Sequence, residues 1–229
     1  MEAWGRVAVV GRLGGGNRNE VLEIRRAGER LVARRSSRSS AALAWELDLL
    51  EFLSAQSFLV PTVVPALDGS RSVAGWVVQR WLPGRAPHAD DWPAVAEELR
   101  RLHSLTGAWP QRPGFASTAD LLTASHGGDV DLSAMPPEAV AMCRSAWRAL
   151  PPERAVIHGD PGAPNIRITR EGVGFLDWDE ARVDNPALDL ADLPGASAVA
   201  RRAVDAWEAA CSWQPELAYA RTRLARLTN

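Results

Sequence analysis

The sequence contains no lysine, and every one of its 26 basic residues is an arginine. A phosphate-binding loop of the GxxxxGK[ST] type and a Schiff-base lysine are therefore excluded. The two cysteines, Cys143 and Cys211, stand far apart and in no metal-binding spacing, which predicts reduced thiols in a cytoplasmic protein. Any nucleotide chemistry in this chain must use arginine, carboxylates and a metal ion.

Long apolar runs and an excess of positive charge are also missing. No apolar run approaches the ~20 residues of a membrane helix, and the first residues lack the pattern of a signal peptide. The formal net charge is −2, so nothing attracts the chain to nucleic acid or to an anionic membrane. We expect a small-molecule substrate rather than either of these partners, and the sequence does not indicate an oligomeric state.

The distribution of patterns predicts an α+β protein with a small antiparallel β N-lobe and a mostly helical C-lobe. In the N-lobe we expect strands over 21–26, 31–35, 62–67 and 72–81, and a helix over 41–53. Leu82-Pro83-Gly84 interrupts the pattern, which predicts an N-lobe over 1–81 and a C-lobe over 82–229. In the C-lobe we expect helices over 93–105, 137–150 and in two stretches after Pro194, with short strands within 155–179.

The densest chemical signal is the segment HGDPGAPN at 158–165, followed by GFLDWDEA at 174–181. Phosphoryl transfer needs a carboxylate that orients the attacking hydroxyl, and oxygen ligands that hold Mg²⁺ against the phosphates. Asp160 and Asn165 have the spacing of a kinase catalytic loop, and Asp177 follows an apolar run at a strand end. A metal-dependent hydrolase that uses His158, Asp160, Asp177 and Asp179 is a rival interpretation, although such sites usually contain more histidines.

These motifs resemble those of the aminoglycoside phosphotransferase and choline kinase superfamily, whose members have a protein-kinase-like fold. The resemblance implies that Asp160 is the catalytic base, that Asn165 and Asp177 bind Mg²⁺, and that His158 braces the loop. It implies ATP and Mg²⁺ as cofactors and a hydroxyl of a small molecule as acceptor.

Weaker matches follow in the order expected for that family. NPALDLA at 185–191 resembles a DPxxDLA segment, which implies a structural role for Asp189 at the site. LRRLHSL at 99–105 resembles the helix with a Leu-His pair. VVQRWLPG at 77–84 resembles the hinge that binds adenine, which implies nucleotide contacts for Val78, Gln79 and Trp81.

The N-lobe adds candidate nucleotide contacts. The glycines at 14–16 allow backbone amides to approach phosphates, which makes Gly15 and Gly16 candidates, but a strand pattern follows them instead of the helix of a dinucleotide-binding loop. Val21 and Val32 fall where the family places an apolar roof over adenine. Arg167 falls where relatives place an apolar residue under adenine, which implies either a cation–π contact with the base or a local difference in the alignment.

Glu46 lies among leucines on one face of the expected helix, and a carboxylate in that position needs a cationic partner. In kinase-like folds the partner is a strand lysine that also contacts the phosphates, and here Arg34 occupies that position. The substitution is explained either by the absence of lysine from the whole chain, since a guanidinium also binds phosphate and carboxylate, or by loss of catalysis. The alternative to a kinase is therefore a nucleotide-binding pseudokinase or regulatory module.

The acceptor is indicated only by charge. Residues 110–229 hold 12 arginines and 16 acids, a balance of 12 − 16 = −4, whereas residues 1–109 hold 14 arginines and 12 acids, a balance of 14 − 12 = +2. An acidic acceptor region favours a cationic substrate such as an aminoglycoside.

Overall fold

The computed structural model describes residues 2–14 and 19–228. Its residues form two compact units. The first comprises Met1–His88 and Pro161–Asp179, and the second comprises Ala89–Asp160 and Glu180–Asn229. The segment that contains Asn165 and Asp177 therefore belongs to the same unit as the N-terminal strands, although more than seventy residues separate them in the chain.

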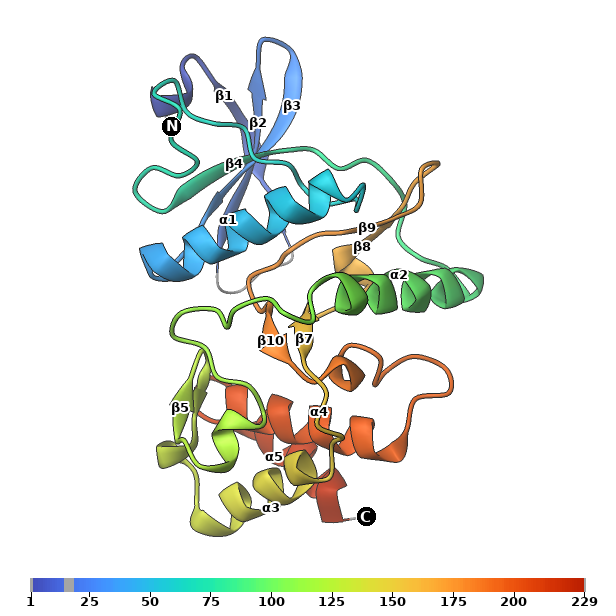
Figure 1. Cartoon of the computed structure of the whole chain (residues 1–229). Helices are drawn as coiled ribbons and strands as arrows, with labels where there is room; N and C mark the ends of the chain where they lie inside the picture. Colours follow the sequence, from blue (N-terminus) through green and yellow to red (C-terminus); the bar gives the residue numbers. More distant parts are fainter. Residues whose placement is uncertain (1, 15–18, 229) are drawn as a thin grey trace. The chain divides into compact units, whose positions relative to one another are not determined.

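The first unit contains a four-stranded antiparallel sheet in the order β1-β2-β3-β4, with helix α1 beside it and a separate two-stranded hairpin, β8-β9 (Figure 1). Its elements are η1 (Glu2–Trp4), β1 (Ala8–Arg12), β2 (Glu20–Arg26), β3 (Glu29–Arg35), α1 (Ser40–Ala55), β4 (Trp76–Arg80), η5 (Ala163–Asn165), β8 (Ile166–Ile168) and β9 (Val173–Phe175). The predicted strands at 21–26 and 31–35 and the predicted helix at 41–53 are confirmed.

Side chains alternate between the two faces of this sheet, as the period of a strand requires. One face of β3 contributes Leu31 and Ala33 to a core that also contains Trp4 and Ile24. The other face carries Val32 and Arg34. Because Arg34 is paired with Val77 across β3 and β4, and Val77 packs against Leu43 and Leu47 of α1, the register brings the β3 arginine close to this helix.

The strand expected over 62–67 is wrong, and the strand expected over 72–81 is shorter than predicted. Val63 forms only an isolated bridge to Gln79, because Pro61 and Pro65 on either side lack the N–H groups that a ladder needs. Ala74 has φ 49° and Gly75 has φ 79°, so the chain turns there and β4 starts only at Trp76.

The β8-β9 hairpin is fixed to the rest of the first unit by two isolated bridges, between Leu59 and Gly174 and between Arg85 and Ile168. A Cβ on Gly174 would lie 2.6 Å from a terminal methyl carbon of Leu82, so a larger residue there would require the Leu82 side chain to move. The hairpin register pairs Ile166 with Phe175. The residues just outside that pair, Asn165 and Leu176, therefore lie together at the open end of the hairpin.

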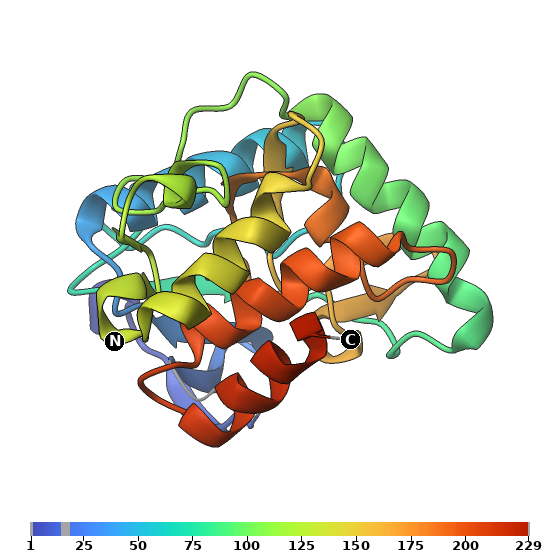
Figure 2. The same ribbon diagram turned by 90° about the horizontal axis from the view of Figure 1, so that it is seen from below.

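The second unit is mostly helical, as predicted. Its elements are η2 (Ala89–Asp91), α2 (Trp92–Leu105), η3 (Asp120–Leu122), β5 (His126–Gly127), β6 (Val130–Asp131), η4 (Leu132–Ala134), α3 (Pro137–Arg148), β7 (Ala155–Ile157), β10 (Arg182–Asp184), η6 (Pro186–Leu188), α4 (Ala198–Cys211), α5 (Leu217–Ala225) and η7 (Arg226–Thr228). Helices α3, α4 and α5 lie side by side (Figure 2).

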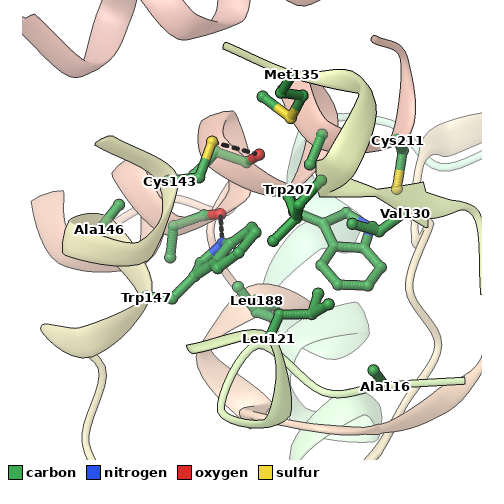
Figure 3. Close-up of a cluster of buried hydrophobic side chains, with 14 of the residues drawn as sticks. Ala116, Leu121, Val130, Met135, Cys143, Ala146, Trp147, Leu188, Trp207 and Cys211 are labelled. Carbon is green, nitrogen blue, oxygen red and sulfur yellow. Dashed lines mark hydrogen bonds between the residues drawn. The ribbon is translucent and has the colours of Figure 1, made fainter. Parts of the chain in front are cut away.

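The core of the second unit lies between α3 and α4 and is built around two tryptophans (Figure 3). The indole N–H of Trp147 donates to the carbonyl of Ala203, and its ring lies 6.4 Å from that of Trp207. Burial raises the pKa of the Cys143 thiol in this core to about 12, which keeps it protonated at neutral pH. Across the described residues, no helix has the length and apolar character needed to cross a bilayer.

Candidate active site

The HGD loop begins where β7 ends, and the carboxylate of Asp189 fixes its backbone. Asp189 Oδ2 accepts the main-chain N–H of His158 at 2.8 Å, and Oδ1 accepts that of Gly159 at 2.9 Å. The Nε2 atom of His103, from α2, lies 3.0 Å from Asp189 Oδ2. One buried carboxylate thus joins the LRRLHSL helix and the NPALDLA segment to the loop.

The loop holds the main chain of Asp160 in place, and Asp160 itself is exposed. His158 is fully buried, and its Nδ1 atom accepts the main-chain N–H of Asp160 at 3.3 Å. Gly159 has φ 90°, and a Cβ there would lie 2.7 Å from the carbonyl oxygen of Glu180. His158 therefore contacts the backbone of the loop from its buried side, and only glycine fits between it and Asp160.

Asp189 remains ionised despite its burial. Burial alone would raise the pKa of Asp189, but its hydrogen bonds with His103 and with the Gly159 N–H lower it. Hydrogen bonds to the charged form stabilise a carboxylate in this way. The anchor of the HGD loop is thus a charged group whose hydrogen bonds compensate for its burial.

In the first unit, the open end of the β8-β9 hairpin brings together the two candidate metal ligands. The main-chain N–H of Leu176 donates to the carbonyl of Asn165 at 2.7 Å, and Asp177 is the next residue. Asp177 is exposed and has φ 52°, a left-handed conformation that is uncommon for non-glycine residues, although Asp adopts it more readily than most. Carboxylate and amide oxygens are ligands that Mg²⁺ accepts, so Asn165 and Asp177 could hold this cation.

The predicted pairing of Arg34 with Glu46 is present in the structure. Arg34 Nη2 contacts Glu46 Oε1, and Arg34 Nη1 lies 3.3 Å from Asp179 Oδ1. Burial alone would lower the pKa of Arg34, but the charges of Glu46, Asp179 and Asp177 raise it. The guanidinium is therefore a permanent cation between two carboxylates, one from α1 and one that follows β9.

The remaining predicted nucleotide contacts are divided between the two faces of the sheet. Val21 and Val32 lie on the face of Arg34, because Val21 pairs with Arg34 and Val32 pairs with Gln79. Val78 projects to the other face, where it is fully buried in the core. Its side chain is therefore separated from the others by the sheet, since neighbouring residues of a strand point in opposite directions. Gly15 and Gly16 lie outside the described residues.

Trp81 and Arg167 make contacts other than those predicted from sequence. The guanidinium carbon of Arg30 lies 3.4 Å from the ring centre of Trp81, which is a cation–π contact. Arg167 Nη1 donates to the carbonyls of Pro164 at 2.9 Å and of Ile166 at 2.7 Å. Arg167 thus folds back on the loop and supports the backbone on either side of Asn165.

Sequence reasoning missed three residues of these two clusters. His103 was given no role at the site, although the Leu-His pair in LRRLHSL was a usable signal. Asp179 was considered only for the rival hydrolase, and Arg38 was not considered. Arg38 Nη2 lies 2.7 Å from Asp179 Oδ2, and its Nε lies 3.1 Å from the same atom. No local pattern predicts this contact, because 141 residues separate the two side chains.

Two hollows lie in the second unit. One of about 460 Å³ lies between the start of α2 and the segment before α4, with Trp92, Arg100 and Leu193 in its wall. A shallower one of about 360 Å³ is formed by the β5-β6 hairpin and Gln214. Neither of these two hollows includes Asp160 in its lining. In the part of the chain that the structure describes, no group of three or more His, Cys, Asp or Glu side chains is placed to hold a metal ion.

Comparisons with known proteins agree with this geometry. The model of the phosphotransferase enzyme family matches residues 9–224. No curated protein sequence gives a significant match.

Solved structures show the same fold at low identity. The choline kinase LicA from Streptococcus pneumoniae is 13% identical, with a TM-score of 0.68 over 99% of this chain and 94% of that chain. A thermostable mutant of the aminoglycoside phosphotransferase APH(4)-Ia, solved with ADP and hygromycin B, is 14% identical, with a TM-score of 0.65 over 99% and 94%. The amicoumacin kinase hAmiN, solved with AMP-PNP, Ca²⁺ and Ami, is 15% identical, with a TM-score of 0.61 over 95% of this chain and 71% of that chain.

The family match covers nearly the whole chain, and the structural matches confirm the predicted protein-kinase-like α+β fold. The chain therefore belongs to the phosphotransferase enzyme family.

Proposed function

We propose that this phosphotransferase moves the γ-phosphate of ATP, with Mg²⁺, onto a hydroxyl of a small molecule. The observation that carries the proposal is the anchoring of the HGD loop by Asp189, which fixes the backbone before Asp160 while Asp160 itself is exposed. Catalysis of phosphoryl transfer depends on positioning and electrostatics more than on covalent chemistry by the protein. A rigid loop that presents one carboxylate meets this requirement.

Asp160 is the proposed general base. The acceptor hydroxyl forms a bond to the γ-phosphorus, the bond from that phosphorus to the bridging oxygen breaks, ADP leaves, and the hydroxyl proton passes to the Asp160 carboxylate. A positioned general base contributes about 10²–10⁴-fold to such a step. The main-chain contact between Asp160 and the buried His158 restricts where the carboxylate can go.

Asn165 and Asp177 are the proposed residues that would hold Mg²⁺, because amide and carboxylate oxygens are ligands that this cation accepts. When bound, Mg²⁺ neutralises negative charge on the phosphates. The hydrogen bond from the Leu176 N–H to the Asn165 carbonyl supports this role, because it holds Asn165 close to the residue before Asp177. The solved amicoumacin kinase was bound to AMP-PNP and Ca²⁺, which supports a nucleotide with a divalent cation.

For the acceptor we propose a cationic alcohol, such as an amino alcohol or an aminoglycoside. One structural relative is a choline kinase and another is an aminoglycoside phosphotransferase solved with hygromycin B, and both support this choice. The excess of four acids over arginines in residues 110–229 favours the same class of substrate.

The proposal is tested by incubating the protein with ATP, Mg²⁺ and a panel of cationic alcohols and neutral sugars, and detecting phosphorylated product by mass spectrometry. We expect Mg²⁺-dependent product with at least one cationic alcohol. Tight ATP binding without any product across the panel would favour the pseudokinase. No binding of ATP or ADP would contradict the kinase and the pseudokinase together.

A further inference from the structure

Asp179 lies at the centre of a buried charge network that joins three parts of the first unit. It contacts Arg34 of β3 and Arg38, which follows that strand, while Arg34 also contacts Glu46 of α1. The Arg34, Glu46 and Asp179 side chains are 7%, 1% and 6% exposed. Two arginines therefore face two carboxylates, and their formal charges cancel.

Two guanidinium groups face Asp179 in its buried position, Arg34 at 3.3 Å and Arg38 at 2.7 Å. A buried charge is tolerated when partners of opposite charge surround it with good geometry.

The geometry explains why position 34 holds arginine. Each terminal nitrogen of Arg34 contacts a different carboxylate, Nη2 with Glu46 and Nη1 with Asp179. A guanidinium is a planar fork whose separate donors can do this, whereas a lysine presents one compact ammonium. The contact with Asp179 restrains the rotation of the guanidinium about its last bonds, which the pair with Glu46 alone does not.

We propose that Asp179 is a positioning residue for Arg34, and that Arg34 and Asp179 form a matched pair. Asp179 and Glu46 together fix the plane of the guanidinium, so that its orientation toward the phosphates of a nucleotide is set before the nucleotide binds. The inference rests on the proposed function, which supplies the nucleotide as the ligand that Arg34 faces. The absence of lysine from the chain is then not enough to explain Arg34, because a lysine at this position would lose one of the two carboxylate contacts.

The test is a double-mutant cycle of Arg34→Lys and Asp179→Asn, read by the affinity for ADP with Mg²⁺ in isothermal titration calorimetry and by the midpoint of thermal unfolding. Glu171→Gln is the matched control, because Glu171 is an exposed acid in the turn of the same β8-β9 hairpin. We expect Asp179→Asn to weaken ADP binding at least tenfold in the wild-type background. In the Arg34→Lys background the same change should alter the affinity less than twofold, and the control should leave it unchanged.

An equal loss from Asp179→Asn in both backgrounds would overturn the inference, because Asp179 would then act without Arg34. If Asp179→Asn fails to fold, Arg34→Lys alone decides, since it preserves every charge: we expect at least a fivefold loss of ADP affinity, and unchanged affinity would overturn the pairing. If the wild-type protein binds no ADP, the proposed function is contradicted. The pairing is then judged by the unfolding midpoints, where additive shifts would overturn it.

Discussion

The carboxylate of Asp189 accepts the main-chain N–H of His158 at 2.8 Å, and this contact joins residues 31 positions apart in the chain. Asp189 comes from the segment that follows β10, and His158 is the first residue after β7. Because β7 and β10 pair directly, the carboxylate lies beside the start of the HGD loop. The second oxygen of Asp189 binds the next N–H of the loop, at Gly159, so two successive peptide groups before Asp160 are held by one side chain.

Replacing Asp189 by Ala should destabilise the fold. The change leaves the buried N–H groups of His158 and Gly159 without their acceptor, and each unsatisfied buried group costs about 1–3 kcal/mol. We expect a loss of roughly 2–5 kcal/mol in the free energy of unfolding, measured by urea titration. Asp192→Ala is the control, because Asp192 is exposed and lies in the same loop. A loss equal to that of the control would contradict the anchoring role.

Asp189 should also make stability depend on pH. Its pKa is lowered in the folded state, so the unfolded state binds the proton more readily and the contribution of the carboxylate is present above the unfolded pKa of ~3.9. As the pH falls through the lowered pKa, this contribution is lost. The difference in unfolding free energy between wild type and Asp189→Asn should be constant above about pH 5 and should shrink below about pH 4. A difference that grows on acidification would contradict this sign.

The local parts of the fold could be predicted from sequence because they depend on neighbouring residues. The turn at Ala27-Gly28 needs two positive φ angles, and the leucines of α1 mark its buried face. The prediction of a strand over 62–67 was wrong. The segment has the composition of a strand, but its two prolines allow only one bridge to a neighbouring strand. Composition alone does not show where the ladder partners of a segment lie.

The candidate site divides in the same way. Asp160, Asn165 and Asp177 are visible in sequence as two short motifs, and Glu46 as a carboxylate among leucines. Asp179 contacts Arg34 and Arg38 only because folding brings together residues that are 141 or more positions apart in the chain. Nothing near Asp179 in the sequence predicts these contacts.

Replacing Glu46 by Ala should destabilise the first unit by leaving Arg34 with one of its two carboxylates. Removing one partner of a buried ion pair costs about 3–5 kcal/mol, and we expect roughly 3 kcal/mol because Asp179 still faces the guanidinium. The measurement is the free energy of unfolding in urea. Glu51→Ala is the control, because Glu51 is on the same helix but exposed at its contact with Arg71. Equal effects of the two substitutions would argue against a buried pair.

Replacing Asp177 by Ala should remove the effect of Mg²⁺ on nucleotide binding. Asp177 is the exposed carboxylate at the open end of the β8-β9 hairpin, and without it the cation loses a charged ligand. In the wild type we expect ADP to bind at least tenfold more tightly with Mg²⁺ than with EDTA, and in the variant less than twofold. The measurement is calorimetric titration with and without Mg²⁺, with Glu171→Ala as the control. A variant that keeps the full effect of Mg²⁺ would contradict the assignment.

The central claim is that Asp160 is the base of an ATP-dependent transfer to a hydroxyl, and the turnover of Asp160→Asn tests it most directly. The variant keeps the size of the side chain and should bind ADP with Mg²⁺ as the wild type does. With the cationic alcohol that the wild type phosphorylates best, we expect kcat to fall by about 10²–10⁴-fold, measured by coupled detection of ADP. A variant whose kcat stays within threefold of the wild type would contradict the account.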